Sequence, residues 1–141
     1  MSINFSSPER IVQFRKRTYI IVAIQLLMAA TFLFRAGSFL PDKANIFYQS
    51  YFADLVMPFS FYFLLCLYER LMPFLRNWIM KGGIIFVIMT TTEIFQYFGI
   101  YMFGVTFDPL DILAFAIGTA AAVVADLFVF PRVFSFWRIE T

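Results

Sequence analysis

The sequence contains no histidine, and Cys66 is the single cysteine among its 141 residues. The missing histidine excludes a haem, chlorophyll or zinc centre held by imidazole, and one cysteine cannot close a disulfide within the chain. No other set of side chains is typical of a metal or haem site. We therefore expect no metal and no cofactor.

Charge is also scarce, because only 14% of the residues are charged, whereas roughly 25% is usual in a soluble domain. Hydrophobic residues make up 62% of the chain, and 21 of them are phenylalanine. A net charge of +2 leaves no basic surface for nucleic acid, so we expect no nucleic-acid partner. The composition indicates an integral membrane protein whose first partners are lipids.

Four apolar runs are each about long enough to cross a hydrocarbon core of ~30 Å. We place these spans at about residues 18–34, 51–68, 82–103 and 109–130. The first run has a basic start, as signal peptides do, but no small-residue cleavage site follows it, so we expect an uncleaved anchor. The sequence predicts one all-α transmembrane domain over residues 1–141, folded as a four-helix bundle.

The connections differ in character. Residues 35–50 hold Gly37 and Pro41, which favour a loop or a short surface helix. Pro58 should kink the second span, because proline removes an intrahelical hydrogen bond. Residues 69–81 mix basic and apolar side chains, which predicts a short amphipathic connector on the membrane surface. The turn at 104–108 is so short that the last two spans must be antiparallel neighbours.

Orientation follows from the basic residues. Nine lie on one side of the four-span topology: Arg10, Arg15, Lys16, Arg17, Arg70, Arg76, Lys81, Arg132 and Arg138. Only Arg35 and Lys43 lie on the other side. Basic loops stay in the cytoplasm, so we predict a multi-pass protein of the bacterial inner (cytoplasmic) membrane with both termini cytoplasmic.

Polar residues inside the apolar runs are the candidate site. Glu93 falls near the bilayer midplane, and Gln96 lies one turn closer to the outer face. Asp111 and Asp54 lie just inside the outer ends of their spans, and Arg35 closes the first span there. An ionisable residue in hydrocarbon marks a functional site or a structural clasp. We expect these five side chains to converge in the outer half of the bundle; for Glu93 both interpretations stay open, with Gln96 or Gln25 as bonding partner.

Two further features have simpler explanations. Asp108 followed by Pro109 is typical of a helix N-cap and first helical residue. Small residues along the fourth span predict close helix packing, with the third span as the expected neighbour. This stripe comprises Asp111, Ala114, Gly118, Ala122 and Ala125. We expect Asp126 to reach the membrane surface or a basic side chain near Arg132.

Several of these residues resemble the motifs of the VanZ-like family, small bacterial membrane proteins named for a teicoplanin-resistance protein. The resemblance lies in Glu93-x-x-Gln96, in the stretch from Thr106 through Asp108 and Asp111 to Ala114, and in Gly118. Asp42 and Lys43 are similar to a pair that precedes the family's second span.

The chain departs from the family pattern at two places. Ala44 and Asn45 stand where the family often has a histidine, and residues 105–107 stand where it often has an arginine. A related group of uncharacterised bacterial membrane proteins is similar in the same elements.

The resemblance implies a small cell-envelope protein, and three functions remain open. The first is a non-enzymatic protein that binds a lipid, lipid-linked or glycopeptide-like ligand through Glu93, Gln96, Asp111 and Arg35. The second is a structural or accessory subunit of a larger membrane complex or homo-oligomer. The third, an intramembrane enzyme or proton-coupled transporter, is disfavoured because the chain has no histidine, no placed nucleophile and only four short helices.

Overall fold

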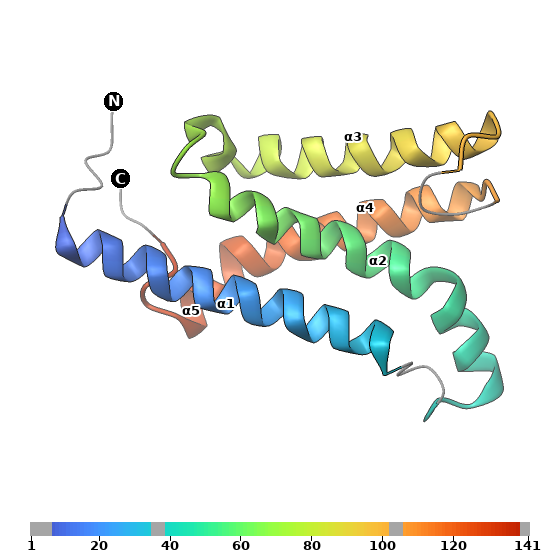
Figure 1. The fold of residues 1–141 in the computed structure, drawn as a ribbon, viewed down its shortest axis with the longest axis horizontal. Helices are drawn as coiled ribbons and strands as arrows, with labels where there is room; N and C mark the ends of the chain where they lie inside the picture. The colour runs from blue at the N-terminus through green and yellow to red at the C-terminus, as the bar shows by residue number, and fades with distance from the viewer. Residues whose placement is uncertain (1–6, 35–38, 102–105, 139–141) are drawn as a thin grey trace.

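The computed structural model describes residues 7–34, 39–101 and 106–138, and in these it contains helices and no strand. The main helices are α1 (Pro8–Leu33), α2 (Asp42–Tyr68), α3 (Trp78–Tyr97) and α4 (Pro109–Val124) (Figure 1). A short 3-10 helix, η2 (Pro73–Arg76), precedes α3. After α4 the chain continues through one π-helical turn, η3 (Ala125–Val129), into α5 (Phe130–Val133).

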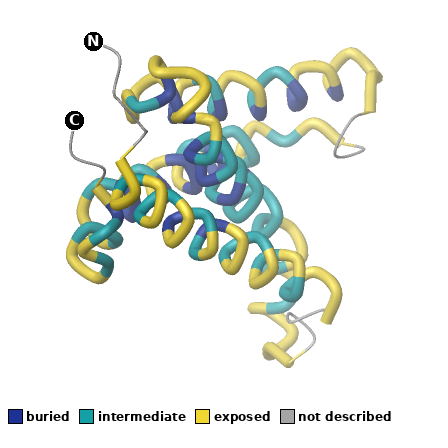
Figure 2. The backbone as a smooth tube through the Cα atoms, turned by 60° about the vertical axis from the view of Figure 1, so that its left-hand side comes forward, coloured by how far each residue is buried: buried dark blue, intermediate teal, exposed yellow. Residues whose placement is uncertain are grey.

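Four of these segments are long and apolar enough to cross a membrane: α1, α2, α3 and the continuous stretch Pro109–Val133. The expected all-helical fold with four helices of spanning length is therefore confirmed for the described residues, and it is compatible with a multi-pass membrane protein. Large apolar side chains such as Leu33, Phe39 and Leu71 lie on the outside of the bundle, where lipid would cover them. Buried residues instead line the surfaces where the helices face one another (Figure 2).

Three helices begin earlier than the apolar runs suggested, and α3 also ends earlier: it runs over Trp78–Tyr97 instead of about 82–103. α1 runs unbroken from Pro8, with Ser7 as its N-cap residue, whereas the first span was expected to begin at about residue 18. α2 begins at Asp42, so residues 42–50, expected to be a loop or a short surface helix, are helical and continuous with the second span. The reason is local: neither glycine nor proline interrupts residues 42–50, and Asp42 suits the positive end of the helix dipole.

The small-residue stripe of α4 packs against α2, so the expectation that α3 would be its neighbour is wrong. A Cβ atom on Gly118 would lie 2.2 Å from the carbonyl oxygen of Leu55 and 2.8 Å from Cγ of Pro58. Only glycine allows the two backbones to approach this closely. α2 is thus the central helix of the bundle, in contact with α1, α3 and α4.

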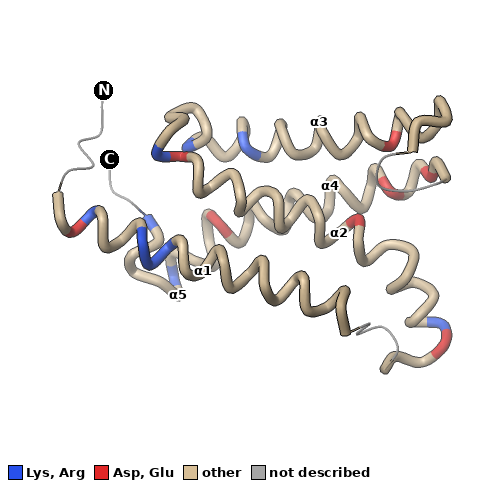
Figure 3. Tube along the Cα trace, viewed as in Figure 1, with Lys and Arg blue, Asp and Glu red and all other residues tan. Residues whose placement is uncertain are grey.

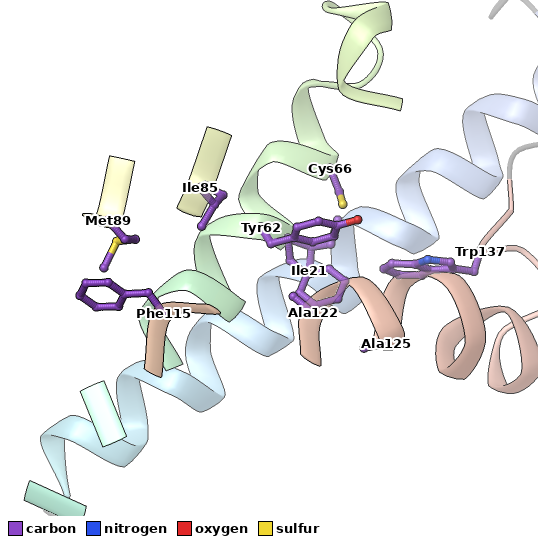
Figure 4. Close-up of a cluster of buried hydrophobic side chains, with 10 residues drawn as sticks. Ile21, Tyr62, Cys66, Ile85, Met89, Phe115, Ala122, Ala125 and Trp137 are labelled. Atoms are coloured by element: carbon purple, nitrogen blue, oxygen red, sulfur yellow. The ribbon is translucent and has the colours of Figure 1, made fainter. Parts of the chain in front are cut away.

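The hydrophobic core joins side chains from every long helix. Ile21 of α1, Tyr62 of α2, Met89 of α3 and Phe115 of α4 are almost fully buried in it, and Trp137 closes it behind α5 (Figure 4). Charged residues lie mostly toward the two ends of the bundle (Figure 3). We call the end where α1 begins and α5 ends the termini end. The end that holds the α3–α4 connection is the hairpin end.

Candidate functional site

The predicted site residues gather at the hairpin end. Asp54 comes from α2, Glu93 from α3, Asp108 from the N-cap of α4 and Asp111 from its first turn. Three separate helices therefore bring four carboxyl groups to one end of the bundle. We call Asp54, Glu93, Asp108 and Asp111 the carboxyl cluster.

Glu93 is the most deeply buried member, at 2% exposure. Its Oε1 accepts a hydrogen bond of 2.8 Å from the backbone N–H of Asp108. This N–H lies at the start of α4, where helices have no backbone partner for their first amides. The observed partner is neither Gln96 nor Gln25; Gln25 instead bonds Ser60 of α2. This hydrogen bond links α3 to the start of α4.

Asp108 is the helix cap that its position beside Pro109 predicts. Its Oδ1 accepts a hydrogen bond of 2.9 Å from the backbone N–H of Leu110. Its carboxyl group also lies in side-chain hydrogen-bonding reach of the Tyr51 hydroxyl. Both the amide and the carboxylate of Asp108 are thus occupied by the protein itself.

Asp54 and Asp111 form the unsatisfied part of the cluster. Their partly buried carboxyl groups lie within side-chain hydrogen-bonding reach of one another, from α2 and α4. No lysine or arginine in the described part of the chain pairs with either. Two carboxyl groups at this range repel each other unless a proton or a cation lies between them. This pair can accept hydrogen bonds or bind positive charge.

Gln96 lies on the same buried stripe of α3 as Glu93, and its side-chain oxygen has no hydrogen-bond partner. A buried amide oxygen without a donor is costly and calls for an explanation. Arg35, the remaining predicted site residue, lies outside the described residues. The structure therefore places Asp54, Glu93, Gln96 and Asp111 at the same end of the bundle.

A second polar cluster lies at the termini end, and the sequence analysis did not predict it. It consists of four charged side chains: Arg17 of α1, Glu69 at the C-cap of α2, Lys81 of α3 and Asp126 of η3. Arg17 Nη1 lies 2.6 Å from Glu69 Oε2, and Lys81 Nζ lies 2.8 Å from Asp126 Oδ2. Lys81 also bonds Glu69. We call these four residues the ion-pair quartet; it carries two positive and two negative charges.

Neutral side chains add to the quartet's bonding, although Arg17 Nε is buried without a hydrogen-bond partner. The Tyr62 hydroxyl and the Trp137 indole N–H each donate to the carboxylate of Asp126, both at 2.8 Å. The Arg17 guanidinium lies over the Trp137 ring, 4.8 Å from its centre. Asp126 itself sits in the π-helical turn η3, a rare geometry that changes which way the following side chains face. Of the two positions expected for Asp126, the structure shows the second: it bonds a basic side chain, that of Lys81, and it is buried.

Cys66 raises the question of a metal at the quartet. The ligand atoms of Cys66, Glu69 and Asp126 lie within 4.8 Å of one another. The Lys81 ammonium, however, donates hydrogen bonds to all three, including one of 3.3 Å to the Cys66 sulfur. The ammonium occupies the position that a metal ion would need, so these residues do not form a metal site.

Few features of the sequence indicated the ion-pair quartet. Arg17 and Lys81 belong to basic segments that border apolar runs, which is typical of the membrane surface. The usable signal was Asp126, an acidic residue in an apolar run without a capping role.

No family model, no curated protein and no solved structure matches this chain.

Proposed function

We propose that the protein is a non-enzymatic, VanZ-like membrane protein of the bacterial cell envelope that binds a lipid-linked or glycopeptide-like ligand at the hairpin end. The observation that carries this proposal is the Asp54–Asp111 pair. Two helices hold its carboxyl groups together, and no described cation joins them. Glu93 and Asp108 fix the start of α4, from which Asp111 projects.

The chemistry of the cluster indicates what it would recognise. Carboxylates and an amide oxygen are hydrogen-bond acceptors, so the matching ligand groups are donors: hydroxyl, amide N–H or ammonium groups. Sugars and peptides carry such groups at high density. The unpartnered oxygen of Gln96 adds one more acceptor at this end. An anionic head group would instead be repelled by the carboxyl cluster.

The proposed orientation puts the hairpin end on the outer face of the membrane. Arg17 and Lys81 are neutralised by Glu69 and Asp126, so they drop out of the count of basic residues. Nine minus two leaves seven basic residues at the termini end against Arg35 and Lys43. This asymmetry still favours cytoplasmic termini, so the ligand would approach from outside.

The direct test uses the purified full chain in nanodiscs, with teicoplanin and a lipid-linked disaccharide peptide as the two probes. Asp54→Asn combined with Asp111→Asn should weaken binding of at least one probe by tenfold or more, because charge-assisted bonds are lost. The thermal midpoint should stay close to that of the wild type. Asp42→Asn, which alters an exposed carboxylate at the start of α2, is the matched control. Equal binding by the double variant and the control, or no binding of either probe to the wild type, would contradict the proposal.

A second candidate function, as a subunit of a larger membrane complex, is favoured by a groove between α3 and α4. The groove has a volume of about 470 Å³, and small residues line it, among them Gly82, Gly83, Ala116 and Ala120. Small residues allow the backbone of another transmembrane helix to approach closely in lipid. If the protein is such a subunit, gentle detergent extraction followed by native mass spectrometry should recover it with other chains. A monomer in that measurement would exclude this candidate.

A further inference from the structure

A separate pocket lies at the termini end, beside the joint between η3 and α5. Its volume is about 260 Å³, and its lining consists of Leu127, Phe128, Pro131, Arg132 and Arg138. Two of the five lining residues are arginines, and none is acidic. The nearest carboxylate in sequence, Asp126, is held by Lys81 and Trp137 inside the bundle. The pocket is therefore positively charged and lies at the opposite end from the carboxyl cluster.

The two arginines play different parts. Arg138 donates through Nη2 to the backbone oxygen of Leu127 at 3.1 Å, which holds its guanidinium against the pocket. The rest of that guanidinium still has N–H groups to donate. Arg132 is exposed, and within the described part of the chain its guanidinium has no hydrogen-bond or ion-pair partner. One arginine is thus fixed in place and the other is free to close on a ligand.

The length of the last helical segment places the pocket at the level of the membrane surface. Pro109–Val133 is a continuous helical segment of 25 residues. At ~1.5 Å per residue it is about 37 Å long, which exceeds a hydrocarbon core of ~30 Å. Arg132, near its end, lies at the level of the lipid head groups. The exposed side chains of Phe128, Val129 and Val133 around it face the acyl chains.

We propose that this pocket binds the phosphate of an anionic phospholipid. Guanidinium groups bind phosphate oxygens through paired hydrogen bonds, and basic pockets at a membrane surface select anionic lipids. The volume exceeds that of a single water (~30 Å³) and falls short of sites for drug-sized ligands (about 300 Å³ and above), so it suits a compact phosphoglycerol head group. The apolar half of the lining accommodates the first carbons of the lipid chains. This site is independent of the proposed function at the hairpin end.

The test titrates phosphatidylglycerol onto the full chain in a neutral detergent and follows bound lipid by native mass spectrometry. Arg132→Gln should weaken phosphatidylglycerol binding by tenfold or more, because it removes the free guanidinium. Arg15→Gln is the matched control: it removes an exposed arginine of α1 toward the same end and the same single charge. Its affinity should stay within twofold of the wild type.

Two further ligands identify the source of the phosphate. Phosphatidylcholine, whose phosphate is neutralised by its own choline, should bind more weakly than phosphatidylglycerol and should be insensitive to Arg132→Gln. Soluble glycerol phosphate should bind far more weakly than the lipid, because the apolar lining adds nothing to its affinity. Equal losses in Arg132→Gln and Arg15→Gln would reduce the effect to diffuse surface charge and overturn the site. Glycerol phosphate that binds as tightly as the lipid would overturn the lipid as its ligand.

Discussion

The ion-pair quartet and the carboxyl cluster lie at opposite ends of one bundle and differ in how their charged side chains are paired. In the quartet, two cations face two anions, and Tyr62 and Trp137 supply additional donors to Asp126. In the carboxyl cluster, four acidic side chains meet no described cation. Glu93 and Asp108 accept from backbone amides, and the Tyr51 hydroxyl also lies within reach of Asp108.

This difference is the reason why we give the quartet a structural role and propose the ligand site at the carboxyl cluster. In the quartet the charges balance, and of its buried side-chain atoms Arg17 Nε alone lacks a hydrogen-bond partner, so the network leaves little for a ligand to bind. The carboxyl side chains are hydrogen-bond acceptors only, so the donors that Asp54 and Asp111 lack would have to come from outside the chain. Buried polar groups without partners are uncommon in native proteins, so the hairpin end is where a ligand is most needed.

The largest effect should come from removing one member of the quartet. Lys81→Met leaves Glu69 and Asp126 facing each other without the ammonium, and loss of one partner from a buried ion pair costs about 3–5 kcal/mol. Thermal or denaturant unfolding in detergent measures this loss. Lys43→Met, at an exposed position in the first turn of α2, should change stability by less than about 0.5 kcal/mol. Equal stability of the two variants would show that the quartet does not hold the bundle together.

The next effect concerns the crossing of α2 and α4 that lies between the two clusters. Gly118→Ala places a methyl group against the Leu55 carbonyl oxygen, which cannot move aside, so a loss toward the upper end of about 1–3 kcal/mol is expected. Gly83→Ala is the control, because its new methyl group meets nothing within 4 Å and alanine favours a helix. Gly118→Ala should also separate Asp54 from Asp111 and weaken binding at the hairpin end. A stable Gly118→Ala variant would mean that the helices do not cross this closely.

The sequence was sufficient for the spans, because apolar length alone decides which segments can cross a membrane. It also identified the Asp108 cap and the residues of the carboxyl cluster, because acidic residues in or beside apolar runs are conspicuous. Helix starts were harder: α2 extends back to Asp42 through residues too polar to be counted as a span. Hydropathy indicates which residues can contact lipid, whereas a helix can also extend through polar residues, as α2 does from Asp42 onward.

The quartet and the α2–α4 crossing could not be predicted for a different reason. Both depend on which helices are neighbours and on how far each is rotated, and hydropathy contains neither quantity. The π-helical turn at Ala125–Val129 changes the direction of Asp126 relative to the stripe on α4. The partner of Glu93 was missed because it is a backbone amide, which every residue except proline carries and no motif distinguishes.

The smallest effect tests whether Glu93 belongs with the structural residues or with the ligand site. Glu93→Gln keeps a side-chain oxygen that can accept from the Asp108 N–H, so the loss should stay below about 1 kcal/mol. Glu93→Met leaves that N–H unpaired and should cost about 1–3 kcal/mol. Unfolding measurements on both variants, together with the teicoplanin and lipid-linked peptide binding assays, separate the two roles. If Glu93→Gln keeps its stability but loses tenfold or more in binding, its negative charge serves the ligand and Glu93 joins Asp54 and Asp111. If binding follows stability in both variants, Glu93 resembles the quartet at the other end: a buried charge whose partner lies within the protein.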